Sequence, residues 1–185
     1  MSKQFTSLTK GIVWCVVIVF SIRCFLSWND LSNNFSTYNL FGYAGESISI
    51  TTVIVIVYER WLWKFNPLEK TPVLFKKYDG FLVSSYDQSK YPIHLEIKQT
   101  LLSTNVILVS GESKSKSLSS SIDEILGETL LTYCYLNTPN STVRHRSEIH
   151  YGTAMICIDN PQELKGHYFS DRKTIGDMEL KAIRD

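Results

Sequence analysis

The chain has 185 residues, of which 44% are hydrophobic and 20% charged, and its formal net charge is +1. Residues 67–185 carry fourteen Lys and Arg against fifteen Asp and Glu, which gives this part a net charge of −1. Because polymeric nucleic acid needs a strongly basic surface to displace its counterions, this balance argues against such a partner, whereas a small anionic ligand needs only two or three well-placed cations.

Two long apolar stretches open the chain, from Gly11 to Trp28 and from Leu40 to about Trp63. Each has roughly the 20 residues needed to cross a hydrocarbon core about 30 Å thick. A cleaved signal peptide and a buried soluble hairpin are the alternatives. The first would need small residues at a cleavage site, and the second would need a charged polar face on the second stretch; the sequence has neither.

The hairpin sets the predicted domain organisation and its orientation. We expect transmembrane helices over about 8–28 and 40–63, within a hairpin unit of residues 1–66, and one cytosolic domain over residues 67–185. Basic residues precede the first stretch and follow the second, and the loop between the stretches has none. By the positive-inside rule, both termini are cytosolic.

Two charged residues lie inside the apolar stretches, Arg23 in the first and Glu46 in the second. On antiparallel helices they would share a depth. A charge inside a bilayer is costly unless it is paired, reaches the interface or lines a water-filled path. We therefore predict an Arg23–Glu46 contact, within one hairpin or between two, with a role in assembly. Independent snorkelling of the two side chains to the interface is the alternative.

From Tyr78 onward, short runs rich in Tyr, Ile, Val, Thr and Phe alternate with turn residues, which is typical of strands. Their close spacing leaves little room for crossover helices. The predicted fold is therefore a membrane-anchored all-β protein, with a small antiparallel β-barrel of about eight strands behind the two-helix hairpin. An open sandwich and a helical turn over 119–128 are alternatives. The expected strands are 78–86, 91–101, 104–111, 115–125, 129–137, 147–158, 163–170 and 175–183.

Catalytic motifs are missing from the sequence. It contains no His-Glu-x-x-His, no Gly-x-Ser-x-Gly, no Gly-x-Gly-x-x-Gly and no Cys-x-x-Cys. In that order, these motifs are typical of a zinc site, a nucleophilic serine, a site for a dinucleotide phosphate and a metal-binding pair of thiolates. We therefore expect a protein that is not an enzyme and needs no metal or cofactor.

Candidate ligand-binding residues come from two features. The alternate serines 113–121 share one face of an extended segment, which could line the barrel with hydroxyl groups or form a solvated loop. Aromatic and cationic residues gather in the C-terminal half, where rings stack on bases and Arg binds phosphate. Arg172 lies an even number of residues after Leu164 and Tyr168, which we expect to face the core. In an extended strand it would be on the same face, so we expect it to point inward at the barrel mouth. The candidates are Gln99, Ser115, Ser117, Tyr133, Tyr135, His150, Tyr151, Tyr168, Arg172 and Thr174.

Several short segments follow the hairpin in a characteristic order. They are Trp63–Pro67, Asp79–Ser85, Ile97–Thr100, the spaced serines 113–121, Tyr133–Asn137, His150–Thr153, and Gly166–Arg172 with Thr174 and Gly176. In this order they resemble the two-transmembrane, β-strand-rich effectors of bacterial cyclic-oligonucleotide-based anti-phage signalling systems (CBASS). The resemblance spans nearly the whole chain, although no single segment is specific by itself.

The resemblance implies that one chain, located in the bacterial inner membrane, combines a ligand receptor with an effector that kills the cell. It implies that the cytosolic barrel binds a cyclic dinucleotide made on infection by a partner nucleotidyltransferase. Binding would then drive homo-oligomerisation and membrane disruption, which kills the infected cell. The alternative function is a constitutive membrane-anchored adaptor whose barrel binds a protein partner through sheet edges or exposed strands such as Val106 to Val109.

Overall fold

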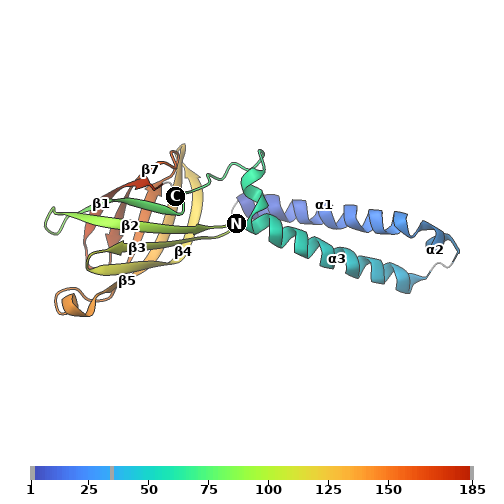
Figure 1. The fold of residues 1–185 in the computed structure, drawn as a ribbon, viewed down its shortest axis with the longest axis horizontal. Coiled ribbons are helices and arrows are strands. Elements are labelled where there is room, and N and C mark those ends of the chain that lie inside the picture. The colour runs from blue at the N-terminus through green and yellow to red at the C-terminus, as the bar shows by residue number, and fades with distance from the viewer. Residues whose placement is uncertain (1–2, 34–35, 184–185) are drawn as a thin grey trace. The chain divides into compact units, whose positions relative to one another are not determined.

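The chain folds into a helical unit and a β-barrel unit (Figure 1). The computed structural model describes residues 3–33 and 36–183, and the two compact units span residues 1–69 and 70–185. Part of the connection that the sequence predicts to be a loop is helical: a short helix covers residues 29–33, and the second long helix begins at Thr37. The elements of the first unit are α1 (Lys3–Leu26), α2 (Trp28–Asn33), α3 (Thr37–Arg60) and the 3-10 helix η1 (Leu62–Phe65).

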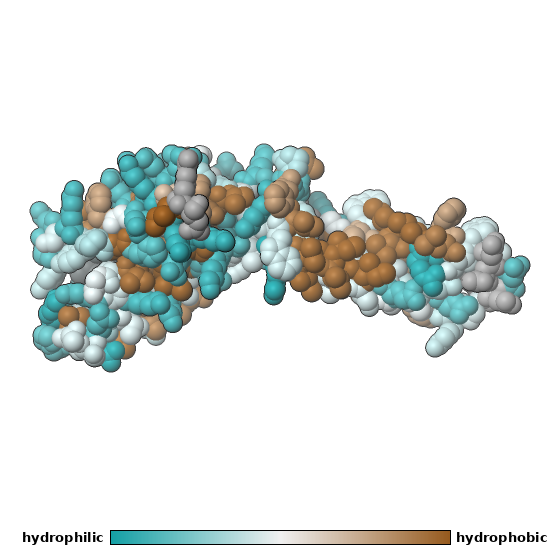
Figure 2. Space-filling model, viewed as in Figure 1, coloured by the Kyte–Doolittle hydropathy of each residue, from teal (hydrophilic) through white to brown (hydrophobic). Residues whose placement is uncertain are grey.

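The long helices α1 and α3 expose their apolar side chains. The segments Leu8–Leu26 and Thr37–Arg60 are long and apolar enough to cross a membrane, and only 0% and 11% of them, respectively, is buried inside the protein. Figure 2 shows the resulting brown surface over the helices. The core helix of a soluble protein would be mostly buried, so this exposure favours membrane association.

The predicted contact between Arg23 and Glu46 is present within the hairpin. Arg23 Nε donates to Glu46 Oε2 at 2.6 Å, and the guanidinium carbon lies 4.3 Å from the centroid of the Tyr43 ring. A second nitrogen of Arg23 donates to the Ser27 hydroxyl. The two charges are therefore paired with each other, as their positions on antiparallel helices allow.

The second unit is a closed antiparallel β-barrel. Its eight strands pair in chain order, and β1 pairs with β8, which confirms the predicted barrel and makes the open sandwich wrong. The helical turn over 119–128 is also wrong, because β4 stays paired with β5 as far as Ile125 and Glu128. The strands are β1 (Lys77–Ser84), β2 (Lys90–Gln99), β3 (Thr104–Ser110), β4 (Ser113–Ile125), β5 (Glu128–Pro139), β6 (His150–Cys157), β7 (Glu163–Ser170) and β8 (Ile175–Ala182).

A bulge in β4 divides its serines between the inside and the outside of the barrel. Pairing with β5 shifts register between Ser117 and Ser119, so that Leu118 is an extra residue with 62% of its surface exposed. Beyond the bulge, Ser119 is exposed and Ser120 is the half-buried residue, with its hydroxyl donating to the Thr104 carbonyl. The prediction of one row of inward serines is therefore wrong past Ser117, because an extra residue reverses the alternation.

One end of the barrel is filled and anchored by its own side chains. Tyr78 is fully buried there, and its hydroxyl donates to Pro161 O at 2.9 Å and accepts from Phe75 N at 3.0 Å. Gln99 accepts from Leu74 N and donates to Pro72 O, both at 2.9 Å, which fixes the segment that leads into β1. The apolar side chains packed beside them are Leu95, Leu131, Ile156, Ile158, Leu164 and Leu180.

The Tyr78 hydroxyl gives a first test of this closed end. Replacing Tyr78 by Phe leaves a partly buried N–H and a partly buried carbonyl without their partner, so we expect the free energy of unfolding to fall by about 1–3 kcal/mol. Urea unfolding of the full chain in detergent, followed by circular dichroism, measures the change. Tyr86→Phe is the matched control, because Tyr86 is 83% exposed. Equal stability of the two variants would contradict the role given to Tyr78.

Candidate ligand-binding site

The other end of the barrel holds an open cavity of about 410 Å³. Every strand contributes residues to its wall. The connections β1–β2, β3–β4, β5–β6 and β7–β8 surround its opening, termed the mouth. Small-molecule sites range from about 300 to 1,000 Å³, and small closed barrels can hold one ligand. The cavity is therefore large enough for a small organic ligand.

Tyrosine rings line the inner part of the cavity. Tyr133 and Tyr135 of β5 are buried, with ring centroids 6.1 Å apart and planes tilted by 53°, and Tyr168 of β7 adds a third ring. Burial raises the pKa of the Tyr133 and Tyr135 hydroxyls, so both remain protonated at neutral pH. These side chains offer aromatic faces for stacking and neutral hydroxyls for hydrogen bonds.

A glycine in β6 makes room for one of these rings. Gly152 pairs with Tyr135, and a Cβ at this position would lie 2.3 Å from Tyr135 Oη and 2.7 Å from Phe169 O. Any larger residue would therefore push the Tyr135 ring or the neighbouring backbone out of place. The position of Tyr135 in the cavity depends on the absence of a side chain at Gly152.

Polar side chains line part of the wall. Ser115 of β4 is buried, and Asn137 pairs with it from β5. The Oδ1 atom of Asn137 is buried and has no hydrogen-bond partner among the described residues. An unsatisfied acceptor of this kind costs about 1–3 kcal/mol, which a donor bound beside it would recover. Further hydroxyl groups in the lining come from Ser84, Ser110, Ser113, Ser147 and Thr174.

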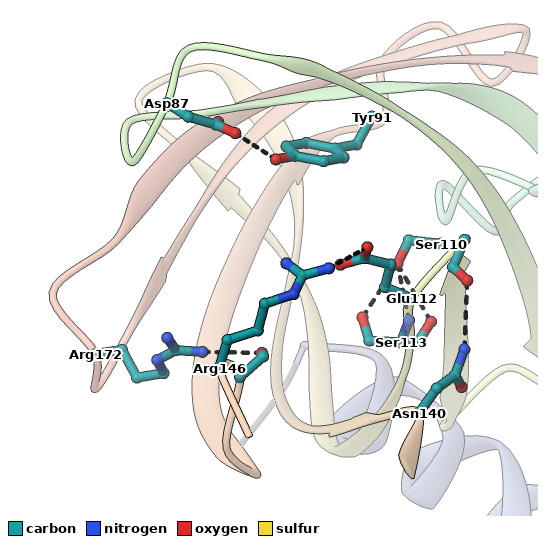
Figure 3. Close-up of polar contacts among 10 residues, drawn as sticks. Asp87, Tyr91, Ser110, Glu112, Ser113, Asn140, Arg146 and Arg172 are labelled. Carbon is teal, nitrogen blue, oxygen red and sulfur yellow. Dashed lines mark hydrogen bonds and ion pairs between the residues drawn. The ribbon is translucent and has the colours of Figure 1, made fainter. Parts of the chain in front are cut away.

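Two arginines and two carboxylates line the mouth (Figure 3). Arg146, from the β5–β6 connection, contacts Glu112 of the β3–β4 turn, with 2.5 Å between Nη2 and Oε1. Arg172, from the β7–β8 turn, donates to the Ser147 hydroxyl at 3.0 Å. A guanidinium binds phosphate or carboxylate oxygens through its planar fork, so these arginines are suited to an anionic ligand.

The second carboxylate of the mouth is also engaged. The Tyr91 hydroxyl donates to Asp87 in the β1–β2 connection. This hydrogen bond lowers the pKa of Asp87 and raises that of Tyr91. Asp87 is therefore an anion at neutral pH and Tyr91 a neutral phenol. Together with Glu112 it balances the charges of the arginines that line the cavity.

The cavity lies within a region that a known protein family covers. The model of the family described as "Cap15, cyclic dinucleotide receptor domain" matches residues 69–182, which include the whole barrel. The chain belongs to this family. It is also 29% identical, over 195 aligned residues and the full length of both chains, to the "CD-NTase-associated protein 15" of Staphylococcus schleiferi. These similarities confirm the resemblance to CBASS effectors and make the barrel a cyclic dinucleotide receptor domain of the Cap15 family.

Most of the residues proposed from the sequence line the cavity of this Cap15 domain. The tyrosines form its inner part, and Arg172 lies at the mouth as its parity indicates. His150 starts β6, and its Nδ1 lies 2.9 Å from the Glu148 carbonyl oxygen. Their contact with a ligand stays a prediction. The seven candidates in the lining are Ser115, Tyr133, Tyr135, His150, Tyr168, Arg172 and Thr174.

Three candidates do not line the cavity, each for a structural reason. Gln99 holds the segment before β1 at the closed end of the barrel. The hydroxyl of Ser117 accepts from Val106 N at 2.9 Å beside the β4 bulge, where it completes the pairing with β3. Tyr151 alternates with the inward residues of β6, so its side chain faces outward and is 58% exposed.

Three charged residues of the loops around the mouth were not predicted as ligand-binding residues from the sequence. Arg146, Glu112 and Asp87 come from three different connections, and their approach depends on how the strands close into a barrel. Arg146 belongs to the cationic residues that gather in the C-terminal half of the sequence, but it is not among the ten candidate residues. No sequence signal distinguishes Glu112 or Asp87 from ordinary turn carboxylates.

Gly152 gives a test of the inner cavity. We expect Gly152→Ala to lower the free energy of unfolding by about 1–3 kcal/mol, because the added Cβ overpacks against Tyr135 and the Phe169 carbonyl. Urea unfolding of the full chain in detergent measures this change. Gly111→Ala is the control, since a Cβ at Gly111 meets nothing within 4 Å. If both alanine variants are as stable as the wild type, the tight fit around Tyr135 is not real.

Proposed function

We propose that this protein is a CBASS effector that binds a cyclic dinucleotide in the barrel cavity, oligomerises and disrupts the bacterial inner membrane. The observation that carries the proposal is the combination of two mouth arginines and three inner tyrosines in one cavity of the Cap15 domain. A cyclic dinucleotide has two phosphodiesters and two bases, and this set of side chains offers partners for both. No catalytic step and no cofactor are part of the proposal.

The arrangement of the cavity suggests how the ligand is oriented. Arg146 and Arg172 at the mouth receive the phosphodiesters through charge-assisted hydrogen bonds. The bases extend inward to the tyrosines, where stacking on an aromatic ring is worth about 1–3 kcal/mol per base. The unpartnered Oδ1 of Asn137 marks a place for a donor from a base or a ribose.

In this proposal, the transmembrane hairpin disrupts the membrane and so kills the infected cell. Both termini face the cytosol, which places the barrel where a cytosolic nucleotide signal is made. One hairpin with its paired Arg23 and Glu46 cannot form a pore, but several hairpins together can expose polar residues to one another and to water. The ligand needs to favour the assembled state by only a few kcal/mol, which is the usual scale of coupling.

The alternative adaptor function loses one of the features on which it rests. A closed barrel leaves no free sheet edge among its strands. In the segment from Val106 to Val109, Val106 is 1% exposed and Leu108 8% exposed, and Ile107 and Val109 are only partly exposed. The closed barrel therefore removes the sheet-edge route to a protein partner, whereas the cavity supports a small ligand.

Ligand binding is tested by removing one guanidinium. For the full chain in detergent, we expect a thermal shift with at least one of a panel of cyclic dinucleotides that carry adenine, guanine or uracil bases. Arg172→Gln is expected to weaken this binding by roughly 10- to 100-fold, because hydrogen bonds to charged groups contribute about 1.5–3 kcal/mol. Lys173→Gln is the matched control in the same turn. An Arg172→Gln affinity equal to that of the control would remove Arg172 from the site.

Membrane disruption is tested by exchanging the paired charges of the hairpin. In dye-filled liposomes, we expect ligand-dependent leakage with the wild type, and its loss with Arg23→Glu or Glu46→Arg, because each change leaves two like charges together in the membrane. The double variant restores opposite charges and is expected to recover leakage. If it leaks as little as either single variant, pairing of Arg23 with Glu46 is not what assembly requires.

A further inference from the structure

The two arginines of the mouth differ in what they contact in the empty barrel. Arg146 is paired with a carboxylate, Glu112, whereas Arg172 contacts the neutral hydroxyl of Ser147 and forms no ion pair among the described residues. Figure 3 shows Arg146 extended from its loop toward Glu112 and Arg172 on the other side of the same loop. One of the two candidate phosphate-binding groups is therefore already occupied by an anion of the same chain.

The ion pair is not what holds the β5–β6 connection in place. Asn140, at the start of this connection, donates its backbone N–H to the Glu112 carbonyl oxygen at 2.8 Å and its amide to Gly111 O at 3.3 Å. Further along, Arg146 N donates to Val143 O at 3.0 Å. These backbone contacts remain if the Arg146 and Glu112 side chains separate, so the pair can open without unfolding the loop.

The Arg146–Glu112 pair also lies where a ligand could replace the carboxylate. The side chains of Arg146 and Glu112 are 56% and 51% exposed, and both line the cavity. Exposed ion pairs contribute little stability, and the guanidinium fork that holds a carboxylate fits phosphodiester oxygens equally well. A phosphodiester at Arg146 must therefore take the place of the Glu112 carboxylate or share the guanidinium with it.

We propose that Glu112 is an internal competitor of the ligand: it occupies Arg146 in the empty barrel and gives it up to a phosphodiester on binding. This inference rests on the proposed function of the cavity. Glu112 then sets the ligand concentration at which the receptor fills. At a low concentration of the dinucleotide, Arg146 stays paired with Glu112. Only a higher concentration displaces the carboxylate.

The experiment is a thermodynamic cycle on the full chain in detergent. Calorimetry measures the affinity for the cyclic dinucleotide of the panel that binds the wild type. We expect Glu112→Gln to bind about two- to fivefold more tightly, as removal of a weak exposed ion pair allows, and Arg146→Gln to bind more than about tenfold more weakly. The double variant is expected to match Arg146→Gln alone, because Glu112 competes only through Arg146. Glu148→Gln, an equal charge change in the same loop outside the cavity lining, should match the wild type.

The outcomes separate this inference from the proposed function. If the wild type binds no dinucleotide of the panel, the proposed function fails and the competition falls with it. If the wild type binds but Glu112→Gln binds no more tightly, the competition is wrong while the receptor function stands. If Glu112→Gln improves affinity equally in the Arg146→Gln background, Glu112 acts by simple repulsion of the ligand, and the exchange at Arg146 is likewise overturned.

Discussion

Seven residue pairs between β1 and β8, from Tyr78–Ala182 to Ser84–Gly176, close the barrel, and the rest of the domain depends on this ladder. Without it, the strands would form a sheet with two free edges and no enclosed interior. The ladder is tight at Gly80, where a Cβ would lie 1.9 Å from Glu179 O. Closure creates the inside of the barrel and brings four connections together around one opening, so the cavity and its mouth both follow from it.

The enclosed interior is divided between stability and binding. At one end, Tyr78 satisfies two backbone groups and apolar side chains fill the space, so this end supplies the burial on which a small domain depends. At the other end, space is left open, and Asn137 keeps a buried oxygen that accepts no hydrogen bond from the part of the chain that the structure describes. The unsatisfied oxygen is a cost to the empty domain, because a buried polar atom without a hydrogen bond destabilises a fold. A ligand that donates to this oxygen would recover the cost, which couples occupancy of the cavity to the stability of the barrel.

The alternation of apolar and polar residues was enough to predict the strands. The features that it did not predict arise from the closure of the barrel and from the bulge in β4. All strand ends lie within three residues of the predicted ones, because the inward and outward residues of a barrel differ in polarity along each strand. The bulge at Leu118 has no such signal, and it reverses the orientation of every later residue in β4. Contacts between loops, such as Arg146 with Glu112, join segments far apart in sequence, so they could be seen only once the strands were placed. Among the candidates, residues in the interior of strands, such as Tyr133 and Tyr135, were placed best.

The Arg146–Glu112 and Arg23–Glu46 ion pairs join the same two types of side chain but lie in different surroundings, and this difference suits the roles proposed for them. At the aqueous mouth, water and salt screen Arg146 and Glu112, so a ligand phosphodiester can replace the carboxylate at small cost. In the hairpin, Arg23 and Glu46 would lie at membrane depth, where the low dielectric constant strengthens their attraction several-fold and leaves no solvent to replace either partner. The first pair is thus free to exchange with a diffusing ligand. The second can exchange only with an equivalent pair from another hairpin, which is what assembly in the membrane would supply.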